Sequence, residues 1–205
     1  MKIVIATRNR HKAVELQTLL HGVGYDAVRL DEIDPDGKIP EVEETGTTFK
    51  ENAFLKAHAI AKATDLPSVA DDTGLEVDAL GGAPGIFSAR YSGENCTYED
   101  NVKKLLNELS DVADDRRTAR FKTVAVYVHK ETELSAEGVV EGVITEKAEG
   151  FGGFGYDPVF SVWDMKKTYA QLADEEKNRV SHRGKAIRSL IEKLHENGLI
   201  ADNPS

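Results

Sequence analysis

The sequence predicts a mixed α/β fold with two lobes that share one core, and the cleft between them is the default ligand site. Three observations lead to this prediction. Short apolar runs typical of buried strands alternate with amphipathic helical patterns in the first part of the chain, and two long strand patterns follow at about 118–130 and 135–146. No stretch rich in Pro, Gly or Ser divides the chain. We therefore expect residues 1–205 to form a single domain, with residues 201–205 a frayed tail.

The first strand and helix are predicted from an apolar run and a capping residue. Residues 2–6 suit a buried strand, and residues 7–22 carry apolar side chains at helical spacing. Asn9 is placed to cap this helix, and Gly22 to end it. The apolar positions are Ala13, Val14, Leu16 and Leu20. A strand, a polar turn and a helix start in this order point backbone N–H groups and a helix dipole outward from residues 7–12.

The next segment is predicted to be a loop, a helix and a strand. Residues 31–44 are acidic, contain proline, and indicate a loop or an edge hairpin. Thr48 and Glu51 have the spacing of a capping box ahead of an amphipathic helix. Residues 66–70 are an apolar strand that runs into residues 71–74, Asp-Asp-Thr-Gly, which we expect to turn.

The remainder of the chain combines glycine-rich loops with two further helices. Residues 81–93 and 149–160 are predicted to be structured loops, because their glycines follow no regular period. Residues 97–109 form an amphipathic helix, and Ser181 is placed to cap a last helix that reaches Leu194.

Charge and composition exclude several classes of function. The chain has 26 Lys and Arg against 36 Asp and Glu, a net charge of −10 that argues against general binding of nucleic acid or of an anionic membrane surface. A small polyanion needs only a local basic pocket and stays possible. One cysteine permits no intramolecular disulfide. The opening residues do not resemble a secretory signal, and no apolar run approaches the length of a membrane span, so we expect a cytoplasmic protein.

Three familiar motifs are rejected and one is kept as an alternative. Residues 150–155 satisfy G-x-G-x-x-G, but Pro158 favours an extended exit where a dinucleotide site needs a helix. No P-loop pattern occurs, and Cys96 and the histidines lack the spacing of a zinc site. Residues 71–74 loosely resemble the aspartyl nucleophile of phosphatases, which stays an alternative.

The acidic groups at the end of the strand predict a magnesium site. Successive strand residues face opposite sides, so one of Asp71 and Asp72 is expected to enter the site. Together with a carboxylate from residues 43–44, it forms the hard oxygen set that binds hydrated Mg2+. Such an ion bridges protein carboxylates and substrate phosphates.

Basic and aromatic residues predict an anionic, aromatic ligand. Thr7, Asn9 and Lys12 lie at the start of a helix, where anions bind. The basic set near the last helix start is unfavourable for the helix dipole, so it contacts either a bound ligand or nearby acids. The members of this set are Lys177, His182 and Arg183. In the second glycine-rich loop Phe154, Tyr156 and Asp157 either recognise a base or anchor the loop. The residues alone thus indicate Mg2+-dependent handling of a phosphorylated metabolite.

Five sequence blocks resemble the Ham1-like inosine triphosphate pyrophosphatases, the house-cleaning dITP/XTP pyrophosphatases. In chain order they are T-x-N-x-x-K (7–12), EETG-x-TF-x-ENA (43–53), ADDTGLEVDALGGAPGIFSARYSG (70–93), GGFGYDPVF (152–160) and EK-x-x-x-SHRGKA (176–186). The resemblance extends from residue 3 to about 195. Arg8 departs from the small residue or Asn of many members, and Thr73 from a common Ser.

The resemblance implies a fold, a reaction and a set of site residues. The fold is an elongated two-lobed body with a mixed sheet flanked by helices and a central substrate cleft, in a homodimer. The reaction is Mg2+-dependent hydrolysis of dITP, ITP or XTP to the monophosphate and pyrophosphate. Asp72 would be the general base and, with Glu43, a metal ligand. The implied substrate-binding residues are Thr7, Arg8, Asn9, Arg10, His11, Lys12, Thr73, Phe154, Gly155, Tyr156, Asp157, Lys177, His182 and Arg183.

Some points stay open at this stage. Whether Glu44, Asp71 or Glu15 also binds metal is undecided. Selectivity for hypoxanthine and xanthine is explained if Arg183, His182 or Lys177 donates to the 6-oxo group, since adenine would leave that donor unpaired at a cost of about 1–3 kcal/mol. The alternatives are a Mg2+-dependent phosphatase with an Asp nucleophile and a nucleotide sensor that does not turn over.

Overall fold

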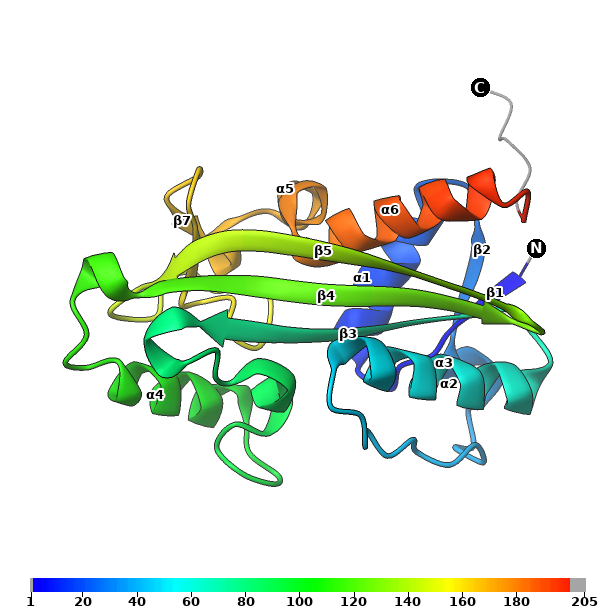
Figure 1. Ribbon diagram of the computed structural model, residues 1–205, viewed down its shortest axis with the longest axis horizontal. Coiled ribbons are helices and arrows are strands. Elements are labelled where there is room, and N and C mark those ends of the chain that lie inside the picture. The colour runs from blue at the N-terminus through cyan, green and yellow to red at the C-terminus, as the bar shows by residue number, and fades with distance from the viewer. Residues whose placement is uncertain (1, 200–205) are drawn as a thin grey trace. The chain divides into compact units, whose positions relative to one another are not determined.

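The described residues, 2–199, contain seven strands that pair into one mixed sheet (Figure 1). Across the sheet their order is β2 (Asp26–Arg29), β1 (Lys2–Ile5), β3 (Ser68–Val77), β4 (Thr118–His129), β5 (Thr132–Ile144), β6 (Phe160–Val162) and β7 (Lys167–Thr168). In this computed structural model β1 pairs in parallel with β2 and β3, whereas β6 is antiparallel to β5 and β7. Six α-helices accompany these strands in residues 2–199: α1 (Arg10–His21), α2 (Leu30–Ile33), α3 (Phe49–Thr64), α4 (Tyr98–Glu108), α5 (Asp174–Val180) and α6 (His182–Glu196). The predicted α/β class is confirmed.

The chain divides into two compact units. The first contains the residues up to Asp72, Thr123–Gly138 and the residues from Arg183 onward. The second contains Thr73–Lys122 and Val139–His182. Strands β3, β4 and β5 contribute residues to both units.

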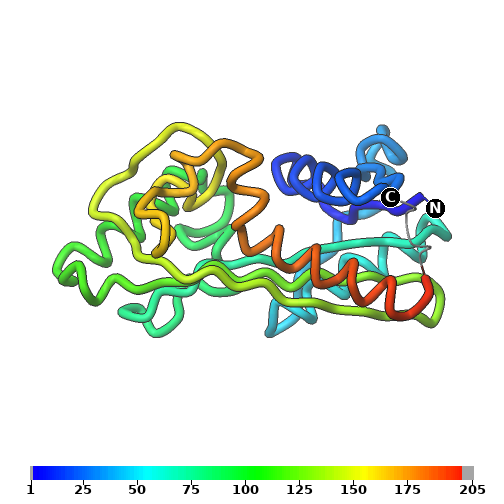
Figure 2. Tube along the Cα trace, turned by 90° about the horizontal axis from the view of Figure 1, so that it is seen from above, coloured from blue at the N-terminus to red at the C-terminus, as the bar shows by residue number. Residues whose placement is uncertain are grey.

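The core of the first unit lies between its strands and two helices. Figure 2 shows α6, coloured orange to red, running along the green strands β4 and β5. Side chains of α1 and α6 pack with those of the strands. Strands β3, β4 and β5 lie between α6 on one side and α3 on the other (Figure 1). The buried members of this core include Ile3, Ile5, Leu16, Leu20, Val69, Tyr127, Ile187 and Leu190.

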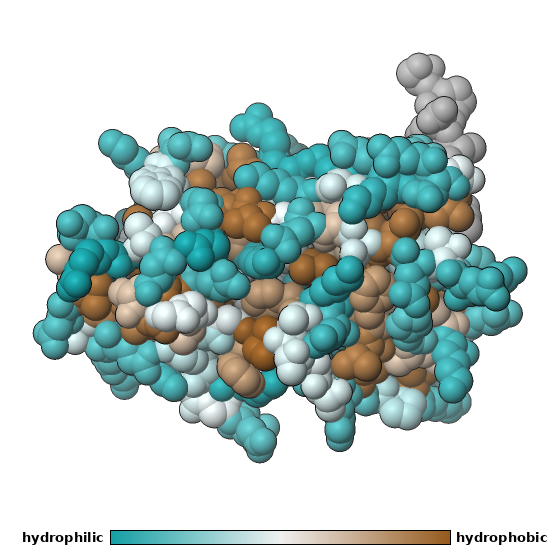
Figure 3. All heavy atoms as spheres, viewed as in Figure 1, coloured by the Kyte–Doolittle hydropathy of each residue, from teal (hydrophilic) through white to brown (hydrophobic). Residues whose placement is uncertain are grey.

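The core of the second unit is built from α4, the later parts of β3 and β5, the start of β4, strand β6 and the segments on either side of β6 and β7. Its buried members include Leu75, Val77, Leu105, Leu109, Phe121, Ile144, Val159, Phe160 and Tyr169. Outside these cores, teal hydrophilic residues cover much of the face seen in Figure 3, with brown apolar areas between them. This agrees with a chain that is 30% charged.

Helix caps follow the sequence patterns closely. The Asn9 side chain accepts from the N–H groups of His11 and Lys12 at the start of α1. Thr48 and Glu51 form the predicted capping box of α3, with both reciprocal hydrogen bonds present. These caps are confirmed because they depend on neighbours within three residues.

Two local predictions differ from the structure. Strand β3 continues through residues 71–74 to Val77, because Leu75 and Val77 are fully buried and hold the chain extended. Val14 is 43% exposed, although its spacing suggested an inward position. The short helix α5, just before Ser181, was not predicted.

Some elements and residues fall outside the predictions. Strand β2 and helix α2 were not predicted, since four-residue elements with charged side chains carry little periodicity. The expected frayed tail, 201–205, lies outside the described residues. A search of the described helices finds none with the length and apolar character that crossing a membrane requires.

Candidate active site

Two adjacent carboxylates on β3 contact different partners. Asp71 is fully buried, and its Oδ2 accepts from Arg183 Nε at 3.1 Å and lies 3.8 Å from Lys12 Nζ. Asp72 is 6% exposed, and its Oδ1 lies 3.3 Å from Lys56 Nζ. The alternation of strand side chains explains the division, as the sequence predicted for this pair.

Lys56, on α3, links two carboxylates. Its Nζ donates to Glu44 Oε1 at 2.8 Å as well as to Asp72. Burial opposes the charge of this ammonium, but Asp72 and Glu44 outweigh burial and raise the pKa of Lys56. Asn52, one helical turn earlier on α3, donates from Nδ2 to Asp72 Oδ2 at 3.4 Å.

The protonation of Asp72 is governed mainly by burial. Burial raises the pKa of Asp72, and the two nearby lysines, Lys56 and Lys12, oppose that rise. A carboxylate with a raised pKa is a stronger base than an ordinary surface aspartate. Asp72 therefore suits proton abstraction from water.

Asp71 belongs to a second, more deeply buried ion cluster. Arg183 is 2% exposed, and its guanidinium donates to Asp71 and to Glu15 on α1. These two carboxylates outweigh burial and raise the pKa of Arg183. Burial lowers the pKa of Lys12, although Asp71 opposes that effect. The structure thus brings Arg183, expected as a base-binding residue, together with acids of the first unit.

The turn from Thr7 to Lys12 is ordered by its own side chains. Thr7 Oγ1 accepts from Asn9 N at 3.2 Å, and Asn9 Oδ1 accepts from His11 N and Lys12 N at 3.1 and 3.3 Å. The cap therefore already occupies two of the N–H groups at the helix start. A phosphate bound here would depend on the cationic side chains of the turn more than on these amides. Arg10 and His11 are exposed.

In the second unit a buried ion pair underlies the glycine-rich loop. Lys177 Nζ lies 2.7 Å from Asp157 Oδ2, and their side chains are 5% and 4% exposed. Phe154 N donates to the same oxygen at 2.8 Å, and Lys177 Nζ is 4.9 Å from the centre of the Phe154 ring. A Cβ at Gly153 would lie 2.0 Å from that oxygen, at a φ of +71°, so only glycine fits there.

The other predicted residues of this unit lie in packed surroundings. Tyr156 is 4% exposed and donates from its hydroxyl to Ser88 O at 2.9 Å. The His182 ring stacks on Phe121 with centroids 4.5 Å apart, and its Nδ1 is 3.4 Å from Tyr169 Oη. Gly155 has a φ of +62° and Thr73 is half-buried. Tyr156 and His182 therefore support the loop and the helix start.

Glu43 and Arg8 stay predictions as site residues, and the sequence analysis did not consider Lys56 and Asn52. Glu43 is exposed, whereas its neighbour Glu44 contacts Lys56. Arg8 turns toward Asp34. Lys56 and Asn52 were missed, although their spacing of four residues on an amphipathic helix is the signal that places them on one face.

No group of three or more His, Cys, Asp or Glu side chains within residues 2–199 is placed to hold a metal. Mg2+ is commonly bound by one or two carboxylates together with substrate phosphates. Glu44 and Asp72 meet that smaller requirement, because their oxygens already converge on one cation, the Lys56 ammonium.

Comparisons with known proteins identify the family of the chain. A model of the Ham1 family matches residues 3–193. The chain is 53% identical over 196 residues to a dITP/XTP pyrophosphatase of Salmonella typhimurium. The aligned residues are 94% of this chain and 98% of that protein. For a dITP/XTP pyrophosphatase of Escherichia coli strain K12 the identity is 52%, with the same coverage.

Solved structures show the same similarity. The Staphylococcus aureus Ham1 protein has a TM-score of 0.82 and 42% identity, over 96% of this chain and 100% of that one. A HAM1 protein from Coxiella burnetii has a TM-score of 0.83 and 40% identity, over 96% of this chain and 99% of that one.

Proposed function

The chain belongs to the Ham1 family, and from that premise we propose that it is a pyrophosphate-releasing hydrolase of non-standard purine nucleoside triphosphates. The substrates are dITP, ITP and XTP, and the products are the monophosphate and pyrophosphate. The observation that carries the proposal is Asp72, a buried carboxylate of raised pKa held between Asn52 and Lys56.

The first unit provides the groups that the hydrolysis needs. Water attacks the α-phosphorus, its proton passes to Asp72, and the bond from the α-phosphorus to the bridging oxygen breaks as pyrophosphate leaves. Lys12 neutralises charge that builds on the phosphate oxygens. Arg183, which also donates to Glu15, holds Asp71 on the other side of the strand and so keeps Asp72 in place.

A divalent metal requirement fits this chemistry, and we propose Mg2+ with Asp72 and Glu44 as its ligands. The contact of both carboxylates with the Lys56 ammonium supports this proposal, because it brings their oxygens to one positive charge. Mg2+ would supply neutralisation of the phosphate oxygens. Glu43, the ligand implied by resemblance, stays a prediction.

The second unit provides groups suited to a purine base. The Phe154 ring offers a stacking surface, and the buried Asp157–Lys177 pair presents an acceptor and a donor in fixed positions. A 6-oxo purine presents an acceptor and an N1–H donor, which match such a pair. Adenine presents the opposite pattern and would leave a buried group unpaired, at a cost of about 1–3 kcal/mol.

The function is tested by a product assay on dITP, ITP, XTP, dATP and dGTP with and without Mg2+. We expect pyrophosphate from the first three only, and only with metal; because guanine shares the 6-oxo and N1–H groups, exclusion of dGTP requires steric or polar rejection at its 2-position. Preference over dATP should be about tenfold to a hundredfold, from the unpaired group. Orthophosphate as the first product would instead indicate a phosphatase, and tight binding without turnover would indicate a sensor.

Replacing Lys56 tests the metal ligands separately. In Lys56→Met, Glu44 and Asp72 lose their shared cation, so the metal-free protein should unfold at a lower temperature than the parent. Added MgCl2 should stabilise the variant more than the parent, by up to about 2.7 kcal/mol at a hundredfold excess over Kd. Thermal unfolding with EDTA or MgCl2 measures this.

The control for this experiment is Lys38→Met. Lys38 is exposed, and among the ion pairs of the described residues it pairs only with Asp36. Equal Mg2+ effects in Lys56→Met and the parent would contradict the assignment.

The homodimer and the cytoplasmic location also stay proposals. Light scattering on purified protein and fractionation of cells check them. The −10 net charge supports the absence of general nucleic-acid or membrane-surface binding.

A further inference from the structure

Arg8 connects the turn of residues 7–12 to a distant segment of the first unit. Its Nη2 donates to Asp34 Oδ2 at 3.1 Å and also to the carbonyl oxygen of Ile39. Arg8 stands between Thr7 and Asn9, which order that turn. Its guanidinium is thus engaged with protein groups on a segment that starts 26 residues later.

Asp34 organises the start of that segment. Besides Arg8, its carboxylate accepts from Lys38 N at 2.7 Å and from Ile39 N at 3.0 Å. The Asp34 side chain is 6% exposed, whereas that of Arg8 is 36% exposed. The hydrogen bond from Ile39 N is the largest influence that lowers the pKa of Asp34, so its carboxylate is charged when it meets the guanidinium. A buried charged acceptor therefore shapes the backbone from residue 34 to residue 39.

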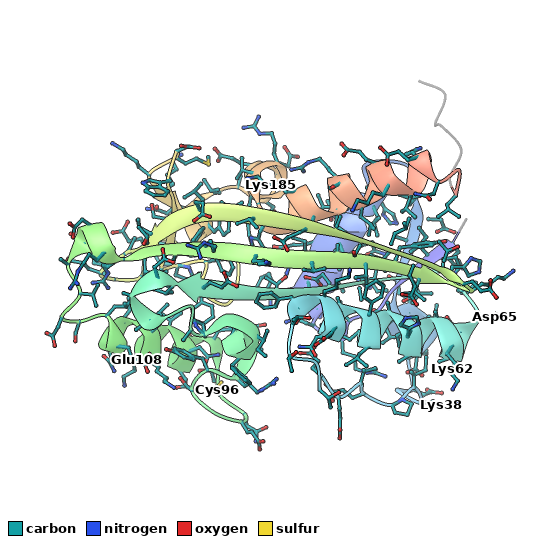
Figure 4. All side chains as sticks on the ribbon, viewed as in Figure 1. Lys38, Lys62, Asp65, Cys96, Glu108 and Lys185 are labelled. Atoms are coloured by element: carbon teal, nitrogen blue, oxygen red, sulfur yellow. The ribbon has the colours of Figure 1, made fainter. Side chains whose placement is uncertain are left out.

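We call residues 34–48, the whole connection between α2 and α3, the strap. The strap contains no helix or strand, and in Figure 4 it carries the labelled Lys38. Glu44 lies in it. At the end of the strap, Gly46 N donates to Asn52 Oδ1 at 2.8 Å, and the same Asn52 side chain donates to Asp72.

The strap is therefore fastened at both ends, with Glu44 between them. A Cβ at Gly46 would lie 2.6 Å from Asn52 Oδ1, which shows how closely this end approaches α3. At the other end Asp34 N donates to Leu30 O of α2 at 2.9 Å, and Arg8 links the strap to the turn of residues 7–12. Without Arg8, Asp34 would still accept from Lys38 N and Ile39 N and so keep residues 34–39 in a turn. That turn would, however, lose the hydrogen bonds that join it to the turn of residues 7–12.

We propose that Arg8 is a positioning residue, which fastens the start of the strap to the turn of residues 7–12 and thereby sets Glu44 beside Asp72 and Lys56. Arg8 acts through Asp34 and Ile39 rather than as a contact to phosphate. The consequence for Glu44 rests on the proposed function, whereas the fastening of the strap does not.

A double-mutant cycle with two readouts tests the proposal. The proteins are the parent, Arg8→Met, Asp34→Asn, the double variant and Arg8→Lys. Lys38→Ala is the matched control, because Lys38 lies on the strap with its side chain 80% exposed. The first readout is amide hydrogen exchange of residues 35–45 without metal or nucleotide. The second is pyrophosphate release as a function of Mg2+ concentration, separated into half-saturation and kcat.

Arg8→Met and Asp34→Asn should each speed exchange of the strap amides about tenfold. Each should also raise the Mg2+ half-saturation concentration about tenfold, as expected for loss of a charged hydrogen bond, with kcat at saturating Mg2+ changed by less than about threefold. The effects of the two single substitutions should not add in the double variant, because both remove the link between Arg8 and Asp34; Asp34→Asn also weakens the acceptor of Lys38 N and Ile39 N, so the double variant should match Asp34→Asn more closely than Arg8→Met. Arg8→Lys should recover part of the loss, and Lys38→Ala should behave as the parent.

Two outcomes would overturn the proposal. One is unchanged strap exchange in Arg8→Met. The other is Asp34→Asn with parental Mg2+ dependence while Arg8→Met raises KM for the nucleotide, which would make Arg8 a phosphate contact. If the parent releases no pyrophosphate, the proposed function fails, and the exchange measurements still decide whether Arg8 fastens the strap.

Discussion

Asp72→Asn is expected to lower kcat for pyrophosphate release about a hundredfold to ten-thousandfold, the range attributed to a general base. The amide has nearly the shape of the carboxylate but cannot take a proton from water. Hydrogen bonding with Asn52 and Lys56 can rearrange around the amide, so the fold should be kept. Steady-state kinetics with dITP at saturating Mg2+ measures the effect.

Two controls make the result specific. Asp26→Asn changes an exposed aspartate of β2 in the same unit and should retain the parental kcat. Circular dichroism and thermal unfolding should show Asp72→Asn folded, and nucleotide binding should persist. A folded Asp72→Asn variant with kcat within about tenfold of the parent would remove Asp72 from the role of base.

Arg183→Met is expected to destabilise the protein by about 3–5 kcal/mol, because removing one partner of a buried ion cluster leaves the other charges uncompensated. Asp71 is fully buried and Glu15 is largely covered, so neither can recover its loss from water. Urea unfolding followed by circular dichroism measures the change in free energy of unfolding.

A second substitution tests whether the loss comes from stranded charge. Arg183→Met combined with Asp71→Asn removes the stranded carboxylate and should be more stable than Arg183→Met alone. Arg188→Met, on the exposed side of the same helix α6, controls for loss of a charged helical residue. If the double variant is no more stable than Arg183→Met, loss of packing rather than of charge explains the effect.

Much of the fold could be predicted because its signals are local. The caps of α1 and α3 depend on residues three positions apart, and the alternation of apolar residues identifies β4 and β5. The extension of β3 through residues 71–74 could not be predicted in this way. An Asp-Asp-Thr-Gly sequence has the composition of a turn, and it stays extended because Leu75 and Val77 are buried in the core of the second unit.

The site divides in the same manner. The placement of Asp71 and Asp72 on opposite sides followed from strand geometry alone. The partners of Arg183 did not, since Glu15 is 168 residues away in sequence and spacing carries no signal of that contact. The choice of Glu44 over Glu43 as the partner of Lys56 likewise depends on how the strap lies, and the strap has no periodic pattern.

The neighbouring positions of Asp71 and Asp72 also make the chemistry sensitive to strand alignment. Val4 faces Ser68 and Ile5 faces Val69 across the pairing of β1 with β3. A slip of one residue in this pairing would put one of the two carboxylates in the position of the other, and Ala70 or Thr73 would take the position left behind, so that either Arg183 or Lys56 would lose its carboxylate. Insertions and deletions within β3 should therefore be tolerated far less than substitutions. An inserted or deleted residue leaves the other side chains of the strand unchanged in identity but moves those that follow it to the opposite face.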